Sequence, residues 1–222
     1  MQRQTKNLNK SIFISKDISE VAILQQFCLA NNINLIAHSL IRFEAIPFQV
    51  NQTYDVLFIS SIRAAEFFLK TEKIKPETVI ACIGQTTASK LEDLGIKISF
   101  VGEKSGNPIE VAEAFKKWLG NRTVLIPQSN ISKRTIGSLL PSNQCIEPIV
   151  YKTVSDCKII AVCNTYIFTS PSNVVSFLKC NKLPLGKIIA WGETTRKQIE
   201  AKGITVSITL QKAEVGELIK LL

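Results

Sequence analysis

The sequence predicts an α/β protein built as two similar lobes, each a parallel sheet flanked by helices. Two observations predict this fold. Apolar, strand-like segments alternate with amphipathic helical segments along most of the 222 residues. In addition, one strand–helix–strand–helix pattern occurs twice, over residues 55–99 and 165–207. Two copies of one unit favour two lobes with a ligand bound between them.

The two copies share their details as well as their order. In each, an apolar strand ends in a hydroxyl pair and leads into a helix that ends Phe-Leu-Lys. A second strand then runs into Gly-x-Thr-Thr and another helix. Outside the copies we expect strands at residues 11–15, 33–37 and 123–127, and helices at residues 19–31, 107–119, within 128–140, and 212–222.

Two extended stretches stand at equivalent points of the two halves, at residues 40–46 and 148–154. We interpret them as the crossovers between the lobes, which makes one lobe discontinuous in sequence. The expected first lobe is residues 1–39 plus 153–222, and the expected second lobe is the inserted segment 40–152. The two connectors are not glycine-rich, flexible linkers, but they still allow hinge motion. We therefore expect the lobes to close on the ligand.

The net charge of +9, with a pI near 9.3, indicates an acidic partner. Nucleic acid and a polyanionic small molecule both fit the charge. No base-stacking aromatic set, zinc finger or basic arm supports nucleic acid. Residues 1–10 lack the apolar segment of a secretory signal, and no apolar run has the length of a membrane span, so we expect neither.

The cysteine and histidine content excludes several kinds of site. The six cysteines form no CxxC or zinc spacing, and we expect them to be reduced, mostly buried side chains in a reducing cytosol. His38 is the only histidine, which argues against a histidine metal site or a His-dependent triad, and we expect it to be structural. Dinucleotide-binding, Walker A, HExxH and GxSxG motifs are also missing from the sequence.

Small polar residues gather where predicted strands meet predicted helices. At such turns in parallel α/β sheets, free backbone N–H groups and the helix dipole favour anions. The alternative is that serine and threonine simply cap helices. Five such turns in a basic protein favour anion binding. The turns contain Ser60, Ser61, Gln85, Thr86, Thr87, Gln128, Ser129, Asn130, Thr169, Ser170, Pro171, Ser172, Glu193, Thr194 and Thr195.

Several stretches together resemble the uroporphyrinogen-III synthase family of tetrapyrrole biosynthesis. They are YDVLFISSIRAAEFF, ACIGQTTASKLEDLG, VLIPQSN, IVYKTV, YIFTSPSNVVSFL and AWGETTRKQIEAKGITV, which cover most of the chain from Tyr54 onward. The chain departs from common family patterns at three points. Ser60–Ala65 replaces Thr-Ser-Lys-Asn-Ala-Val, Glu193 replaces the proline of Gly-Pro-Thr-Thr, and Ser15-Lys16-Asp17 replaces an Arg-Pro.

The resemblance implies a cytoplasmic, monomeric lyase that uses no metal or organic cofactor. Its substrate would be hydroxymethylbilane, a linear tetrapyrrole with four acetates and four propionates, handed over by the preceding deaminase. The enzyme would close this chain with loss of water and inversion of ring D. The departing ring A hydroxyl leaves an azafulvene, ring D attacks it to give a spiro intermediate, and fragmentation and reclosure follow. Because the pyrrole nitrogens drive these steps, the protein mainly positions the substrate.

The resemblance also assigns residues. The VYKT motif matches the family's VYxT, so Tyr151 would assist departure of the hydroxyl, although a strand-end tyrosine is also a common packing residue. Lys90 and Lys133 lie beside the loops and are further candidate carboxylate partners. The expected substrate-binding residues are Ser60, Ser61, Arg63, Gln85, Thr86, Thr87, Ser129, Asn130, Ser170, Pro171, Ser172, Thr194, Thr195 and Arg196.

Two other functions stay open on the sequence alone. A non-catalytic, two-lobed sensor of a carboxylate-rich metabolite would share the fold and the loops, and would lack only turnover. A basic nucleic-acid-binding module would show strongly salt-dependent binding to DNA or RNA. Tyr151 favours the enzyme over the sensor, and the missing aromatic cluster argues against nucleic acid.

Overall fold

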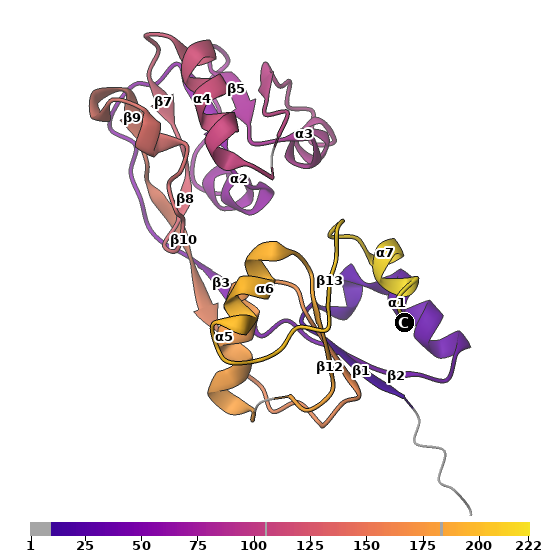
Figure 1. Cartoon of the computed structure of the whole chain (residues 1–222). Helices are drawn as coiled ribbons and strands as arrows, with labels where there is room; N and C mark the ends of the chain where they lie inside the picture. Colours follow the sequence, from indigo (N-terminus) through magenta and orange to yellow (C-terminus); the bar gives the residue numbers. More distant parts are fainter. Residues whose placement is uncertain (1–9, 105, 183) are drawn as a thin grey trace, which may run out of the picture. The chain divides into compact units, whose positions relative to one another are not determined.

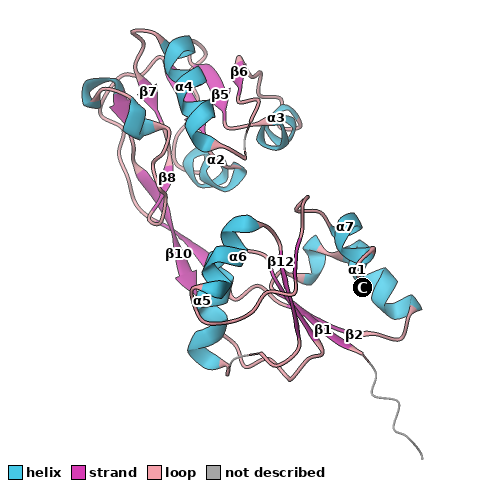
Figure 2. Cartoon of the chain, in the orientation of Figure 1, coloured by secondary structure: helices cyan, strands magenta, loops and turns pink. Residues whose placement is uncertain are grey.

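A computed structural model describes residues 10–104, 106–182 and 184–222 (Figures 1 and 2). The chain divides into two compact units. Unit 1 consists of the described residues up to Arg42 together with Val154–Leu222, and unit 2 is Phe43–Thr153. The chain passes into unit 2 along β3 (Ile41–Ala45) and returns along β10 (Ile149–Ser155).

Unit 1 is a five-stranded parallel sheet with the order β13-β12-β11-β1-β2. Its strands are β1 (Ser11–Ile14), β2 (Asn34–Ala37), β11 (Thr165–Phe168), β12 (Lys187–Ala190) and β13 (Ile208–Thr209). Its helices are η1 (Ile18–Glu20), α1 (Ala22–Ala30), α5 (Pro171–Cys180), α6 (Glu193–Glu200) and α7 (Val215–Ile219). These helices cover both faces of the sheet (Figure 2).

The alternation of side chains along β1 explains why both faces are covered. Phe13 points to one face and packs with α5 and α6, whereas Ile12 and Ile14 point to the other and pack with α1 and α7. All three are almost fully buried. A strand that is apolar on both faces is typical of a parallel sheet with helices on each side.

Unit 2 repeats this architecture with the strand order β6-β5-β4-β7-β9, again parallel throughout. Leu57 and Ile59 of β4 pack on α2 and α3, and Val56 and Phe58 pack on α4. The strands are β4 (Val56–Ile59), β5 (Val79–Cys82), β6 (Phe100–Val101), β7 (Val124–Leu125) and β9 (Cys145–Ile146). The helices are α2 (Ile62–Leu69), α3 (Gln85–Glu92), α4 (Pro108–Leu119), η2 (Gly137–Leu139) and η3 (Ser142–Gln144).

A third, three-stranded sheet has the order β3-β10-β8, where β8 is Gln128–Ser129. Both predicted connectors are therefore strands. Lys152 of β10 pairs with Glu44 of β3 at 2.9 Å. In β8, Ser129 is the register partner of Tyr151 in β10. This pairing places the turn after β7 beside the VYKT motif.

The predicted α/β fold with two parallel sheets flanked by helices is confirmed, and each repeat copy forms one β–α–β–α run. The predicted helix within residues 128–140 is wrong. Arg134 has a left-handed φ of 52° and only the short turn η2 follows, because buried Ile136 packs into the α4 face instead of continuing a helix. The last helix is also shorter than predicted and covers only Val215–Ile219.

The cysteine prediction holds for some residues and fails for others. Cys28, Cys82 and Cys163 are free and buried, as predicted. Cys157 and Cys180 instead form a disulfide, which corrects the expectation that all six are reduced. The fold brings the segment after β10 beside the end of α5, with a Cα–Cα separation of 6.0 Å that suits a disulfide.

Two findings complete the comparison with the sequence. None of the described helices is long and apolar enough to cross a membrane. The expectation of no secretory signal in residues 1–10 falls almost entirely on residues 1–9, which lie outside the described residues.

Candidate functional site

The hydroxyl pairs end the central strand of each sheet and begin a helix. Ser61 is the N-cap of α2, and its Oγ accepts from the Ala64 N–H at 3.2 Å. Ser170 is the N-cap of α5, and its Oγ accepts from the N–H of Asn173 at 3.2 Å. The capping interpretation is therefore correct for these two hydroxyls. Their positions still leave free N–H groups in the first helical turn.

The two Gly-x-Thr-Thr turns have nearly the same backbone. Gly84 (φ 173°, ψ 174°) and Gly192 (φ 175°, ψ 176°) are extended N-caps of α3 and α6. The Gly84 carbonyl accepts from the N–H groups of Thr87 and Ala88 in α3. The Gly192 carbonyl accepts from those of Thr195 and Arg196 in α6. Among the described residues, no partner is found for the backbone N–H groups of Gln85 and Thr86, or of Glu193 and Thr194.

These turns lie at the carboxyl ends of neighbouring strands within each unit. In unit 2, β4 and β5 are paired, so the Ser60-Ser61 and Gln85–Thr87 turns are at the same sheet edge. In unit 1, β11 and β12 are paired, so the Ser170–Ser172 and Thr194–Arg196 turns share an edge as well. Each edge presents unpaired N–H groups at the positive ends of two helices, which suits carboxylates.

Tyr151 lies on β10 in an aromatic cluster of unit 2. Its side chain is 9% exposed, and its ring stacks on Phe67 with centroids 5.1 Å apart and meets Phe43 edge-on at 5.9 Å. The Arg63 guanidinium lies 3.6 Å above the ring of Phe43. In the described part of the chain, Arg63 has no acidic partner and the Tyr151 hydroxyl has no hydrogen bond. Both polar groups are therefore available to a ligand, on a rigid apolar base.

The Ser129-Asn130 turn is fastened directly to the strand that carries Tyr151. The Asn130 N–H donates to the Tyr151 carbonyl at 3.1 Å, and Asn130 Oδ1 accepts from the Thr153 N–H at 2.9 Å. Ser129 is half-buried and Asn130 is exposed. Unit 2 therefore brings Arg63, Ser129, Asn130 and Tyr151 together around β10 and the start of α2.

Arg196 differs from Arg63 because its charge is already matched. Its guanidinium donates to Glu193 (2.5 and 2.8 Å) and to Glu200 (2.5 Å). The hydrogen bonds from Arg196 lower the pKa of Glu193, and Lys197 adds to this from 3.8 Å. In this arrangement Arg196 neutralises the carboxylate at the start of α6. The spacing of three and four residues on a helix could have predicted this network from the sequence.

The remaining predicted residues divide by exposure. Thr195 is 2% exposed, and its N–H is bonded to Gly192, so it is a packing residue of α6. Gln85, Thr86 and Thr194 are exposed, whereas Ser60, Thr87, Pro171 and Ser172 are half-buried. Lys90 and Lys133 are exposed and take no part in the described groups. Phe43 and Phe67, which hold Tyr151, were missed by the sequence analysis, since they come from elements far from it in sequence.

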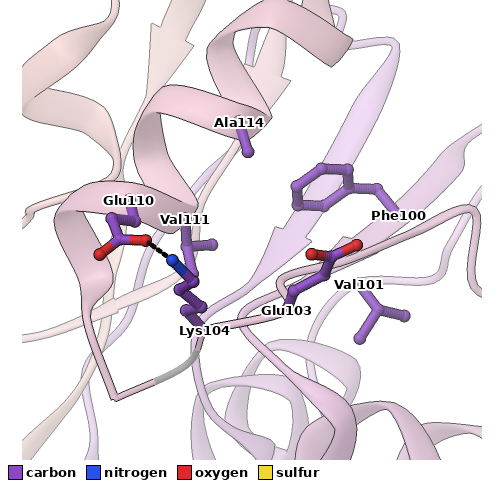
Figure 3. A pocket seen from close by; sticks show the side chains of 7 residues that line it. All are labelled: Phe100, Val101, Glu103, Lys104, Glu110, Val111 and Ala114. Carbon is purple, nitrogen blue, oxygen red and sulfur yellow. Dashed lines mark ion pairs between the residues drawn. The ribbon is translucent and has the colours of Figure 1, made fainter.

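Two cavities lie beside the edge strands of the two parallel sheets. One, of about 320 Å³, follows β6 and is lined by Phe100, Glu103, Lys104, Glu110 and Val111 among others (Figure 3). Lys104 and Glu110 face each other there at 2.6 Å, and this contact lowers the pKa of Glu110 and raises that of Lys104. The other, of about 420 Å³, follows β13 beside α7. Neither cavity is lined by a predicted site residue.

His38 follows β2, and its backbone N–H donates to the Ile14 carbonyl at 3.0 Å. Its Nε2 is buried and has no partner among the described residues. It contacts none of the groups described above by a hydrogen bond, and it remains a structural residue in our interpretation.

A family model described as "Uroporphyrinogen-III synthase HemD" matches residues 26–220. The chain belongs to the uroporphyrinogen-III synthase family. It is accordingly an enzyme of tetrapyrrole biosynthesis, a lyase that cyclises hydroxymethylbilane to uroporphyrinogen III with loss of water and inversion of ring D. No curated protein sequence matches the chain significantly.

Solved structures of other uroporphyrinogen-III synthases share the fold. The uroporphyrinogen-III synthetase of Helicobacter pylori 26695 is 18% identical, with a TM-score of 0.70, covering 96% of this chain and 98% of that one. A mutant synthase from the extremely thermophilic bacterium Thermus thermophilus is 11% identical, with a TM-score of 0.63, covering 95% and 96%. At these identities the likeness extends to the fold, and the residues of the site have to be argued from this chain.

Proposed function

We propose that this synthase binds the carboxylates of its tetrapyrrole substrate at the helix-start turns of both units and uses Tyr151 to assist departure of the hydroxyl. The observation that carries the proposal is made on one aromatic cluster. There the Tyr151 hydroxyl has no hydrogen bond and Arg63 has no acidic partner among the described residues. Phe43 contacts both, since Tyr151 meets its edge and Arg63 covers its face.

The carboxylate role is supported by the free backbone N–H groups. Among the described residues, α2, α3 and α6 each begin with two backbone N–H groups that have no partner. α5 begins with Pro171, which has no N–H, and offers one such group. Backbone donors at a helix start bind anions without reorganisation, and a net charge of +9 raises the local concentration of a polyanion. In unit 2, Arg63 adds a planar guanidinium that matches a carboxylate. The substrate carries eight carboxylates, so several such contacts can act together.

The Tyr151 role is supported by its rigid surroundings. Stacking on Phe67 and the edge contact with Phe43 fix the ring, so its hydroxyl has a defined position. A phenol O–H can donate a hydrogen bond to the departing hydroxyl as the carbon–oxygen bond of the substrate breaks. The pyrrole nitrogen supplies the electron pair that forms the azafulvene. The spiro intermediate then fragments and recloses, and the protein's contribution is chiefly to hold the conformer that gives the inverted ring.

The finer partner and location assignments belong to the same proposal. We expect a monomer that works in the cytoplasm and receives its substrate from the preceding deaminase, without a metal or organic cofactor. The instability of free hydroxymethylbilane supports handover, because it cyclises unaided to the non-inverted isomer. Light scattering tests the monomer, and fractionation of cells that express the chain tests the location.

The deciding experiment generates hydroxymethylbilane in situ, adds the protein, oxidises the products and separates type I and type III uroporphyrin by chromatography. Wild type should give mainly type III. Tyr151→Phe should lower kcat by about tenfold to a hundredfold while type III still predominates, because positioning carries most of the catalysis.

The matched control is Tyr166→Phe, a buried tyrosine of unit 1 whose hydroxyl accepts from the Cys163 N–H. This variant should lose stability and keep its kcat. A Tyr151→Phe enzyme with wild-type kcat would show that the hydroxyl plays no part. Type I alone from folded wild type would refute the whole assignment.

A further inference from the structure

Unit 1 carries exposed apolar residues on two adjacent segments, residues 157–164 and the described residues 180–182 and 184–187; we call the two segments together the patch. Ile159, Val162 and Leu185 are 86%, 84% and 94% exposed. Among the described large apolar side chains these are the three most exposed, and the next is Leu29 at 71%. Scattered exposed apolar residues are ordinary, but the three most exposed described ones stand on two segments that lie side by side, which is typical of an interaction surface.

The two segments are joined at both ends. The Cys157–Cys180 disulfide joins them at one end. Next, Asn181 donates to the Lys158 carbonyl at 2.8 Å and accepts from the Ile160 N–H at 2.7 Å. At the far end the Lys187 N–H donates to the Asn164 carbonyl at 2.8 Å. The two segments are thus held together at both of their described ends.

Gly186 shows how closely the far ends approach. A side chain at this position would collide with the carbonyl of Asn164. Leu185 directly precedes Gly186, and Val162 stands two residues before Asn164, so both lie close in sequence to this contact.

Exposed lysines accompany the apolar residues. Lys158, Lys179 and Lys182 lie within or directly beside the two segments. Lys187 is exposed as well, but its Nζ donates to the Leu221 carbonyl at 3.2 Å. The segments themselves contain no aspartate or glutamate. The nearest acid in sequence, Asp156, faces Arg42 at 3.9 Å. The described residues of the patch therefore combine protruding apolar side chains with exposed lysines.

We propose that this patch docks the enzyme on an anionic membrane surface. Ile159, Val162 and Leu185 would enter the boundary between headgroups and acyl chains, and the lysines would contact anionic headgroups. This is contact with a surface and needs no spanning helix. Charge complementarity favours a membrane over a second copy of the chain, because two copies would place Lys158, Lys179 and Lys182 of one against the same lysines of the other.

The patch lies away from the proposed substrate turns. It precedes β11 and β12, at the amino edge of the unit 1 sheet, whereas the turns at Ser170 and Thr194 follow the same strands at the carboxyl edge. Docking would leave those turns open. The inference consequently stands whether or not the roles proposed for the substrate turns are correct.

The test is co-sedimentation of the full chain with vesicles of phosphatidylcholine, with and without about one third phosphatidylglycerol, at low and high salt. We expect binding only to anionic vesicles, weakening as salt shortens the screening length from about 10 Å at 0.1 M to about 3 Å at 1 M. The variant I159S/V162S/L185S should bind at least about tenfold more weakly. Its turnover in solution should be unchanged, because no altered residue contacts the proposed site.

Two matched controls distinguish binding through the patch from non-specific hydrophobic or electrostatic binding elsewhere on the protein. I23S/L29S removes exposed apolar residues from α1 of the same unit, and K116Q/K117Q removes exposed lysines from α4. Both should bind like wild type, whereas K158Q/K182Q should bind severalfold more weakly. Equal binding by wild type and I159S/V162S/L185S would overturn the proposal, as would no preference for anionic vesicles. A dimer in light scattering that this triple variant abolishes would overturn it in favour of a second copy.

Discussion

The central strands of the two units are tied at their amino ends by the same clasp, built from different residues. In unit 2, Asp55 accepts from the N–H and hydroxyl of Thr123 at 2.8 and 2.9 Å. In unit 1, Asn164 accepts from the N–H and hydroxyl of Ser11 at 2.9 and 3.0 Å. The geometry is retained while a charged acceptor replaces a neutral one. Equivalent backbone positions therefore need not carry equivalent chemistry.

The Gly-x-Thr-Thr turns show the same divergence at the proposed substrate edge. The backbone angles of Gly84 and Gly192 agree within a few degrees. The next residue is neutral Gln85 in unit 2, and in unit 1 it is Glu193, which Arg196 neutralises. Backbone N–H groups are thus the common feature of the two turns, and the side chains decide how each turn meets an anion.

The largest expected effect is a loss of stability that stays within the core of one unit. Phe115 of α4 packs on Phe58 with ring centroids 4.5 Å apart and is fully buried in unit 2. Phe115→Ala should destabilise unit 2 by about 3–5 kcal/mol because it leaves a cavity. Hydrogen exchange resolved by residue should show faster exchange in β4 and β5, with β11 and β12 unchanged. The reciprocal control is Phe177→Ala in unit 1, and matching losses in both units from either variant would contradict separate cores.

The next largest effect is expected from the Cys157–Cys180 disulfide, since among the described residues only unit 1 has a disulfide. Cys157 and Cys180 are separated by 23 residues, and opening a loop of that size should cost unit 1 about 3 kcal/mol. Urea unfolding with and without a phosphine reductant measures this loss in the free energy of unfolding. Cys180→Ser should abolish the reductant effect.

The thiol control for this experiment lies in unit 2. Burial raises the pKa of Cys145 to about 12, so that thiol is unreactive at neutral pH. Cys145→Ser should keep the full dependence on reductant. If the wild-type chain unfolds at the same urea concentration in both states, the crosslink does not stabilise unit 1.

Exchanging the neutral Gln85 and the charged Glu193 between the two Gly-x-Thr-Thr turns should have a smaller effect, and this effect should be on substrate binding. Gln85→Glu should raise KM about fivefold, since α3 has Ala88 where α6 has Arg196 and cannot mask the new carboxylate. Arg196→Gln should act similarly by exposing Glu193. The double variant E193Q/R196Q should then return KM to within about twofold of wild type. A double variant as impaired as Arg196→Gln would mean that Arg196 binds the substrate directly.

Local patterns predicted the sheets but could not predict which residues would meet across them. Strands such as Val56–Ile59 are continuous apolar runs, and the repeated motifs gave the helix starts after them. The Tyr151 cluster draws Phe43 from β3 and Phe67 from α2, and the disulfide joins the segment after β10 to α5. Such contacts depend on the crossing of segments far apart in the sequence. The network of Arg196 is different. The family resemblance assigned Arg196 to the substrate, although the helical spacing from Glu193 and to Glu200 could have predicted these ion pairs.

The smallest expected effect concerns the Asp55–Thr123 clasp of unit 2. Hydrogen bonds from Thr123 lower the pKa of Asp55 below its usual 3.8. A lowered pKa in the folded state gives stability that is full above the unfolded pKa and is lost as pH falls through the folded value. Unit 2 should therefore lose a little stability below about pH 4, less than about 1 kcal/mol because Asp55 is exposed and screened. The Asn164 clasp of unit 1 does not titrate and should lose none.

Asp55→Asn converts the unit 2 clasp to the kind found in unit 1. Its amide oxygen can accept the same two hydrogen bonds, so stability near pH 7 should change little. Thermal unfolding of wild type and variant between pH 3 and pH 7 measures the difference, with Asp93→Asn, an exposed α3 end residue, as the control. Because only the wild type should lose stability as the pH falls, the gap, taken as the stability of wild type minus that of Asp55→Asn, should decrease between pH 7 and pH 3. If the gap stays constant across this range, the carboxylate charge adds nothing to the clasp, and the two units hold their strands by geometry alone.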